Sequence, residues 1–240
     1  MRIGNLIRWA IAIALVTLSF MNASWIAPVP NGAMAMVASK TADKDGCATL
    51  EGVRRALIEV GGPVVLDTDA APGCLPAKTA LEQFPRYRFI LKTHDADKAL
   101  ALFADLKRPI DERYAFVGDE ATVAAIRAKA PEAQAWTIAE GRACFSDYVK
   151  LGWLAMVPES CRGKAIIVPL DQKWKVAGWP KRFQTRMAAA KTQMILAAPG
   201  EQTDAIPGLT QLEQIPEVPR DYMGWLWVDD AALIGPSVRR

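Results

Sequence analysis

Polar residues stand where several predicted strands end, and their types suit the binding of a phosphate group. They are Asp67 and Asp69, then Lys92, Thr93 and His94, then Glu159, and last Asp229 and Asp230. Carboxylates that converge on a lysine can hold a divalent cation and a phosphate, because hard cations prefer oxygen ligands and an ammonium group is a point charge for phosphate. Asp67 and Asp69 are therefore candidate metal ligands. The alternative for each residue is a helix cap or a solvated loop.

Lys92 and His94 are the candidate catalytic residues, and Lys92, Glu159 and Trp227 are the candidate substrate-binding residues. His94 is the only histidine of the chain, and acid–base catalysis needs a group that exchanges a proton near neutral pH. The alternative for His94 is a histidine in a surface loop, because it directly precedes a predicted helix N-cap at Asp95. The sequence has no G-x-G-x-x-G, P-loop, G-x-S-x-G or H-E-x-x-H motif.

The elements that must position these residues alternate regularly. Strands are predicted over residues 64–66, 87–92, 114–117, 135–138, 153–157, 166–168, 194–197 and 225–228. Helices are predicted over residues 49–60, 77–84, 95–106, 119–130, 142–151, 179–190 and 209–215. Such alternation is typical of βα units in a parallel sheet. We predict an α/β fold, namely a TIM-type (β/α) barrel that is incomplete or has a degenerate first strand. An open doubly wound sheet is the alternative.

The N-terminus has the features of a secretory signal. Arg2 and Arg8 precede or flank an apolar run over residues 9–20, and small residues follow at 22–24 and 33–35. We expect residues 1–35 to be a signal peptide, or alternatively an N-terminal anchor, and residues 36–240 to form a single domain. The protein is then exported, to the periplasm or the extracellular space. No later segment has 18 consecutive apolar residues, so no further membrane span is expected.

The four cysteines all lie in the expected mature part. An even count in an exported chain predicts two disulfides. We favour Cys47–Cys74 and Cys144–Cys161, because each closes a short loop, whereas free thiols or a metal site are the alternatives. The formal net charge of +3 is small and no basic run occurs, so no nucleic-acid partner is expected.

Tryptophans are concentrated in the second half of the chain. They are Trp153, Trp174, Trp179, Trp225 and Trp227. They could line an aromatic cleft for lipid headgroups or glycans, with Trp174 the best candidate for exposure. The alternative is packing in the core and at the barrel rim.

Several segments carry a family resemblance. Residues 49–62 read T-L-E-G-V-R-R-A-L-I-E-V-G-G and precede V-V-L-D, and residues 75–85 read L-P-A-K-T-A-L-E-Q-F-P before a strand that ends at Lys92. These segments resemble the glycerophosphodiester phosphodiesterase family. Residues 151–162, 178–187 and 222–236 are similar to a branch of exported bacterial members of that family.

The resemblance implies a TIM barrel that hydrolyses phosphoric diesters in lipid metabolism. It also implies a histidine pair as general acid and base, and a divalent cation, Ca²⁺ or Mg²⁺, held by acidic residues. The aspartate of the family's V-E-L-D corresponds to Asp67 and the lysine of its E-x-K to Lys92. The two glutamates of those motifs are Val65 and Ile90 here.

Both histidines of the family's pair are missing from this sequence. Residues 43–46, D-K-D-G, stand where the first should be, and the segment for the second is almost wholly missing between Asp69 and Leu75. His94 would have to substitute for them. The chain is therefore expected to be a degenerate enzyme, with a cation only if it is active.

Three functions are compatible with these residues. The first is a metal-dependent phosphodiesterase that acts on a small phosphodiester or lipid headgroup. The second is a non-catalytic module that keeps the phosphate pocket, and the third is a structural protein of the cell envelope. A barrel that lacks a strand exposes backbone edges, which a homodimer would cover.

Overall fold

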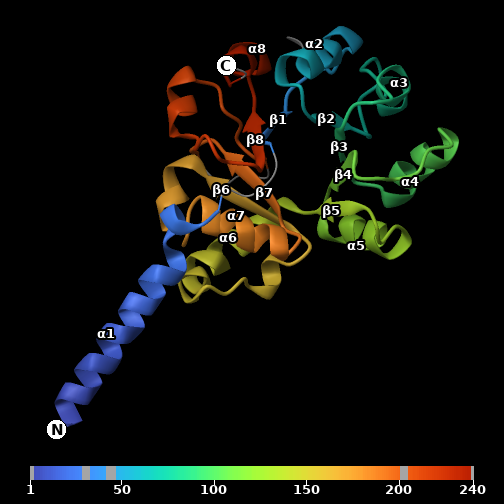
Figure 1. Cartoon of the computed structure of the whole chain (residues 1–240). Coiled ribbons are helices and arrows are strands. Elements are labelled where there is room, and N and C mark those ends of the chain that lie inside the picture. The colour runs from blue at the N-terminus through green and yellow to red at the C-terminus, as the bar shows by residue number, and fades with distance from the viewer. Residues whose placement is uncertain (1–2, 29–32, 42–46, 201–204, 239–240) are drawn as a thin grey trace.

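The computed structural model describes residues 3–28, 33–41, 47–200 and 205–238. Its strands form one eight-stranded sheet in the order β5-β4-β3-β2-β1-β8-β7-β6, and each recorded pair is parallel. The strands are β1 (Ala35–Ala38), β2 (Val64–Asp67), β3 (Phe89–Lys92), β4 (Tyr114–Val117), β5 (Gln134–Trp136), β6 (Ala165–Pro169), β7 (Gln193–Ala197) and β8 (Trp225–Val228). Figure 1 shows the helices arranged around the outside of this sheet.

Helices connect successive strands. The α-helices are α1 (Ile3–Asn22), α2 (Leu50–Val60), α3 (Ala77–Gln83), α4 (Ala96–Asp105), α5 (Glu120–Lys129), α6 (Ile138–Leu151), α7 (Lys181–Ala189) and α8 (Ala231–Val238). Short 3₁₀ helices are η1 (Ser24–Ile26), η2 (Gly152–Leu154), η3 (Glu159–Cys161), η4 (Leu170–Lys175) and η5 (Leu212–Glu217). The alternation of strand and helix builds the incomplete TIM-type barrel that the sequence predicts.

The barrel is open at one seam, between β5 and β6. These two strands are the ends of the sheet order, and no ladder joins them among the described residues. The first strand, in contrast, is present: β1 pairs with β8 from Ala35 to Ala38 and with β2 at its end. The barrel is therefore incomplete on the side of β5 and β6, rather than at its first strand.

Local sequence chemistry sets the start of several helices. The side chains of Thr49, Asp95, Asp119 and Thr137 each accept a hydrogen bond from the backbone amide three residues further on. This is the usual N-cap arrangement, and it confirms the cap predicted at Asp95. Gly61, with a φ of 63°, ends α2 in the left-handed conformation that glycine adopts without strain.

Alternate residues of each strand face opposite sides of the sheet, and both sides are buried. One set packs outward against the helices, as Leu66 and Leu91 do. The other set fills the barrel interior with apolar side chains, joined by Ile206 from the loop after β7: Val37, Ile90, Ala115, Val117, Trp136, Ala165, Ile167, Ile195, Ala197 and Trp227. Burial on both sides explains why the strands are short apolar runs rather than alternating ones.

The strand predicted over residues 153–157 is wrong. Gly152–Leu154 form η2, and Ala155 follows in the left-handed conformation with a φ of 60°, which an extended strand does not allow. Trp153, Leu154 and Met156 are exposed. The apolar run thus covers part of the outer surface instead of entering the sheet.

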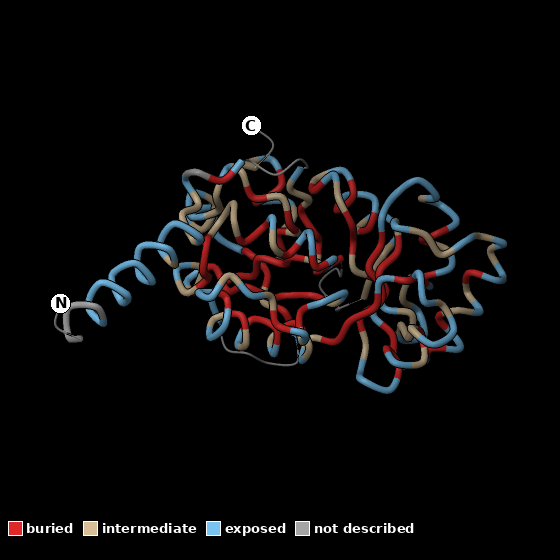
Figure 2. The backbone as a smooth tube through the Cα atoms, turned by 60° about the horizontal axis from the view of Figure 1, so that its bottom comes forward, coloured by how far each residue is buried: buried red, intermediate tan, exposed pale blue. Residues whose placement is uncertain are grey.

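Helix α1 projects from the barrel, and its described side chains are exposed except for the half-buried Leu18 and Asn22 (Figures 1 and 2). Its last turn is tied to the domain, because Arg186 donates to the side chain of Asn22 at 3.0 Å and to the carbonyl of Met21 at 2.9 Å. No helix in the described ranges, α1 included, is long and apolar enough to cross a membrane. The predicted boundary at residue 35 falls on the first residue of β1.

Two disulfides are present, in the predicted pairs Cys47–Cys74 and Cys144–Cys161. The first ties the segment before α2 to the loop after β2. The second joins α6 to η3, and both of its cysteines are fully buried. Two disulfides are compatible with the oxidising compartment that an exported protein reaches.

Candidate functional site

Two adjoining cavities open at the C-terminal ends of the strands, where TIM-type barrels carry their active sites. The inner one has a volume of about 290 Å³ and lies against β1, β2, β3 and β8. The outer one, of about 670 Å³, extends over the ends of β3, β4 and β5 toward the open seam. Lys92, Val117 and Ile138 line both cavities. We call the two together the mouth.

Lys92 stands at the centre of the mouth. It is the last residue of β3, and strand alternation places it on the same side of the sheet as Ile90, toward the barrel interior. Its side chain is exposed and forms no ion pair with any residue in the described ranges. The ammonium group is thus available to an anion that enters either cavity.

The floor of the inner cavity is apolar. Val65, Ile90 and Val117 line it, together with Trp227 from β8, which is only 5% exposed. Of the five tryptophans singled out in the sequence, Trp227 is the one that reaches the mouth. Trp174, at 71% exposed, lies on the surface beside Lys175, and Trp179 packs against Phe183.

One wall of the inner cavity carries a charged pair that is already neutralised. The ammonium of Lys40 lies 2.7 Å from Asp229 Oδ2, and the hydroxyl of Ser39 donates to Asp229 Oδ1. Asp229 follows β8, as the sequence predicts for a carboxylate at a strand end. Its two oxygens are bound within the protein, so this carboxylate positions the β1 loop rather than offering itself to a ligand.

Asp69 is bound in a similar way. Its Oδ1 lies 2.7 Å from the ammonium of Lys98, and its Oδ2 accepts the backbone N–H of His94 at 3.0 Å. The hydrogen bond from Lys98 lowers the pKa of Asp69, burial opposes it, and the amide of His94 lowers it further. Asp67 lies beside it and accepts the backbone N–H of Asp69 at 2.8 Å. In the loop after β2, the ammonium of Lys98 therefore already neutralises the carboxylate of Asp69.

These residues do not fit the divalent cation that the family resemblance implies. Within the described part of the chain, no three His, Cys, Asp or Glu side chains gather closely enough to hold a metal ion. Asp69 is committed to Lys98, and the positions of the two family glutamates, Val65 and Ile90, supply no oxygen to the mouth. The D-K-D-G segment at 43–46 lies outside the described residues.

His94 pairs with an aspartate at the rim of the outer cavity. Its Nδ1 lies 3.6 Å from Asp119 Oδ2, and both side chains are more than half exposed, at 62% and 51%. Asp119 is also the N-cap of α5, and the hydrogen bonds from Thr122, first from its backbone N–H, hold the pKa of Asp119 below its usual value. Lys92 and His94, both at the end of β3, line the same cavity, and their catalytic roles stay predictions.

Glu140 completes the outer cavity and bridges the seam. Its carboxylate accepts two hydrogen bonds from Arg127, at 2.8 and 3.0 Å, and lies 3.1 Å from the ammonium of Lys164, just before β6. Sequence reasoning missed this cluster. The signal was the capping-box spacing of Thr137 and Glu140, which the structure shows in full.

Glu159 lies away from the mouth. It belongs to η3, which precedes β6, and its side chain is 91% exposed and pairs with Arg162 in the next turn. The sequence placed it at a strand end because residues 153–157 looked like a strand. Since that strand does not exist, nothing carries Glu159 to the carboxyl edge of the sheet.

Comparison of the chain with protein-family models, with curated proteins and with solved structures gives no match. The fold and the two disulfides therefore stand on the structure itself. The family, the cation, the homodimer and the residue roles inferred from the sequence stay predictions.

Proposed function

We propose that this protein binds a small phosphate-bearing molecule, such as a glycerophosphodiester or a lipid headgroup, at the mouth of its barrel without hydrolysing it. The observation that carries this proposal is Lys92. Its ammonium forms no ion pair among the described residues and lines both mouth cavities. An unpaired lysine attracts phosphate oxygens as a point charge.

The surroundings of Lys92 suit such a ligand. The apolar floor of Val65, Ile90 and Trp227 gives the carbon part of a headgroup a surface to pack on. Arg142, whose guanidinium donates to the carbonyl of Ala205, also lines the outer cavity and adds positive charge there. The resemblance of the strand that ends at Lys92 to a phosphodiesterase motif supports the same class of ligand.

Binding without turnover is favoured because two acidic residues near the mouth already form ion pairs with lysines. Asp69 is paired with Lys98, and Asp229 is paired with Lys40. Neither carboxylate is therefore poised to act as a base or to hold a cation next to Lys92.

The test compares binding and hydrolysis in one preparation. Calorimetry measures the binding of glycerophosphocholine and of inorganic phosphate to the full chain, with glycerol and choline as unphosphorylated controls. The release of glycerol phosphate is measured in parallel. Lys92→Met keeps most of the unbranched side chain and removes its charge. Lys150→Met is the matched control, because this lysine lies in the last turn of α6 and lines neither mouth cavity.

We expect glycerophosphocholine to bind, and Lys92→Met to weaken binding about tenfold to a hundredfold, the value of a hydrogen bond to a charged group. Lys150→Met should leave the affinity unchanged. Equal affinity for phosphate and glycerophosphocholine would identify free phosphate as the ligand. If neither phosphate compound binds the folded chain, the proposal is wrong.

A second function, hydrolysis of the same diester, is favoured by one observation. His94 lies beside Asp119 and lines the same cavity as Lys92. A histidine oriented by a carboxylate is a general base. His94→Gln should then abolish the release of glycerol phosphate, and the control variant Lys78→Met, which keeps His94, should retain it. This result would establish hydrolysis instead of binding alone.

A further inference from the structure

An apolar surface lies on the outside of the barrel, where helix α1 meets the domain. We call it the apolar patch, and its exposed side chains are Trp25 of η1 and, at the end of α6 and just after it, Leu151, Trp153, Leu154 and Met156. None of them lines either mouth cavity, so the patch is separate from the site proposed above. Beyond the patch and α1, the exposed large apolar side chains of the described ranges stand singly along the sequence, which is ordinary for a protein surface.

The two parts of the patch are far apart in sequence and are joined by hydrogen bonds. The side-chain amide of Asn22 donates to the carbonyl of Trp153 at 2.8 Å. Arg186 of α7 donates to the carbonyl of Met21 at 2.9 Å and to that of Gly152 at 3.0 Å. The backbone that carries the patch is thus held against the domain, with its apolar side chains outward.

The segments that form the patch carry no charged residue. Residues 21–28 read M-N-A-S-W-I-A-P and residues 151–158 read L-G-W-L-A-M-V-P. Helix α1 continues this apolar surface, because residues 9–16, W-A-I-A-I-A-L-V, are apolar for more than two turns and hence on every side of the helix. A groove of a partner protein covers one face of a helix, whereas lipid can surround it. The patch and α1 together therefore fit a lipid partner.

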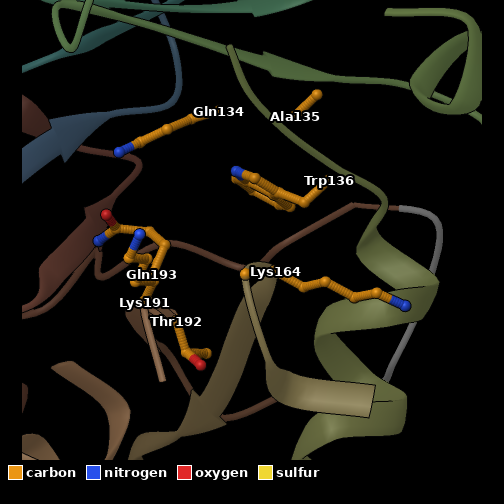
Figure 3. Close-up of a pocket in the computed structure, with 8 residues that line it drawn as sticks. Gln134, Ala135, Trp136, Lys164, Lys191, Thr192 and Gln193 are labelled. Atoms are coloured by element: carbon orange, nitrogen blue, oxygen red, sulfur yellow. The ribbon is translucent and has the colours of Figure 1, made fainter. Parts of the chain in front are cut away.

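The end of the barrel beside the open seam has the opposite character. A cavity of about 310 Å³ lies there, at the starts of β5, β6 and β7. Figure 3 shows polar side chains around it, among them Gln134, Lys164, Thr192 and Gln193. Contact with hydrocarbon would take these groups out of water without giving them new partners, which is unfavourable. This end of the barrel therefore suits water rather than lipid.

We propose that the apolar patch seats this protein on the surface of a lipid bilayer. The indole rings of Trp25 and Trp153 suit the level of the headgroups, where tryptophan is enriched because its ring is apolar and its N–H is polar. Leu154 and Met156 enter the boundary of the acyl chains, and α1 adds apolar surface beside them. Since the patch has no charge of its own, binding needs no anionic lipid.

Two matched variants of the full chain test the contribution of the patch. Leu154→Ser removes an apolar side chain that is 52% exposed, and Ile58→Ser removes one that is 56% exposed on α2, away from α1 (Figure 1). Flotation with phosphatidylcholine vesicles at graded lipid concentrations measures the affinity of each variant. We expect Leu154→Ser to bind about tenfold more weakly, because burying most of a leucine side chain is worth roughly that ratio. Ile58→Ser should bind as the unsubstituted chain does, and added salt should not release it.

Tryptophan fluorescence locates the patch on the vesicles independently of the strength with which α1 binds. Lipids that carry bromine on their acyl chains quench indole rings that lie in the bilayer. Removing a quenched ring, in Trp153→Phe, lowers the quenched share of the total emission, whereas removing a ring that lies in water raises it. We expect the quenched share to fall.

Four results would overturn the proposal. A quenched share that rises in Trp153→Phe would place this ring in water. Equal affinities of Leu154→Ser and the unsubstituted chain would mean that α1 binds lipid alone. Binding only to vesicles that contain phosphatidylglycerol would show an electrostatic contact in place of an apolar one. Self-association in sedimentation without vesicles, abolished by Leu154→Ser, would show that a second copy of the chain covers the patch.

Discussion

Arg127 and Glu140 form a two-pronged ion pair that ties α5 to the first turn of α6, at the edge of the open seam. Both guanidinium nitrogens reach the carboxylate, at 2.8 and 3.0 Å, and the same guanidinium donates to the carbonyl of Ala135 in β5. Lys164 joins the carboxylate from the side of β6. With no backbone ladder between β5 and β6 in the described ranges, these side chains connect the two halves of the sheet there.

Glu140→Gln is expected to destabilise the fold by about 2 kcal/mol, because it removes the charge from hydrogen bonds that involve two cations. Urea denaturation at neutral pH measures the change. Glu132→Gln, on an exposed carboxylate in the turn before β5, is the control and should have almost no effect. A loss as small as that of the control would mean that the seam does not depend on this cluster.

The same carboxylate gives a pH dependence. Burial alone would raise the pKa of Glu140, but the hydrogen bonds from Arg127, the amide of Thr137 and Lys164 outweigh it and lower the pKa. A group with a lowered folded-state pKa stabilises the protein fully above its unfolded value, about 4.3 for glutamate, and this contribution is lost as the pH falls through the folded value. Below about pH 4.3, denaturation midpoints should therefore fall more steeply with falling pH for the unsubstituted chain than for Glu140→Gln.

Lys98→Met is expected to raise the pKa of Asp69 toward the ordinary aspartate value of about 3.9. The ammonium of Lys98, 2.7 Å away, is the largest cause of the lowered value. NMR titration of the carboxyl carbon reports the change. Lys78→Met, next to Asp105 at 3.4 Å on the surface, serves as the matched variant and should leave Asp69 as it is. An Asp69 titration that is the same in both variants would contradict the pairing.

The two disulfides are expected to be reduced in a fixed order. Cys144 and Cys161 are fully buried between α6 and η3, whereas Cys47 and Cys74 are partly exposed. A soluble thiol should therefore reach Cys47–Cys74 first. Alkylation and mass spectrometry after graded reduction give the order, and early labelling of Cys144 would refute it. Loss of Cys144–Cys161, whose cysteines are 17 residues apart in sequence, should cost about 3 kcal/mol.

Gly235→Ala is expected to destabilise the protein by about 1–3 kcal/mol through overpacking. Helix α8 crosses α2 so closely at Gly235 that a Cβ atom would clash with the backbone carbonyl of Glu59. Gly200→Ala is the control, because a methyl group there meets only ordinary contacts with Pro207. Thermal unfolding of the two variants should separate them, and equal melting temperatures would show that the helices can move apart at no cost.

Local chemistry carried in the sequence determined most of the architecture. The apolar runs and their spacing predict strands β2 to β8 and helices α2 to α7, but not β1 or α8, and the helix predicted over residues 209–215 is the 3₁₀ helix η5. Asp95 predicts a helix start that the structure confirms. The pairing of Cys47 with Cys74 and of Cys144 with Cys161 follows from short loops. Each of these features depends on residues that lie close together along the chain, so a single sequence contains the information.

Tertiary packing alone decided the rest. Whether β5 meets β6, and hence whether a cavity forms beside Trp136, depends on how strands distant in sequence close the barrel. The same holds for the partners of the carboxylates: Asp69 is a plausible metal ligand in the sequence, but a lysine 29 residues away neutralises it. Residues 153–157 have the composition of a strand, and only the left-handed turn at Ala155 excludes them from the sheet. The fold therefore follows from local patterns, and the site follows from contacts that only the folded chain makes.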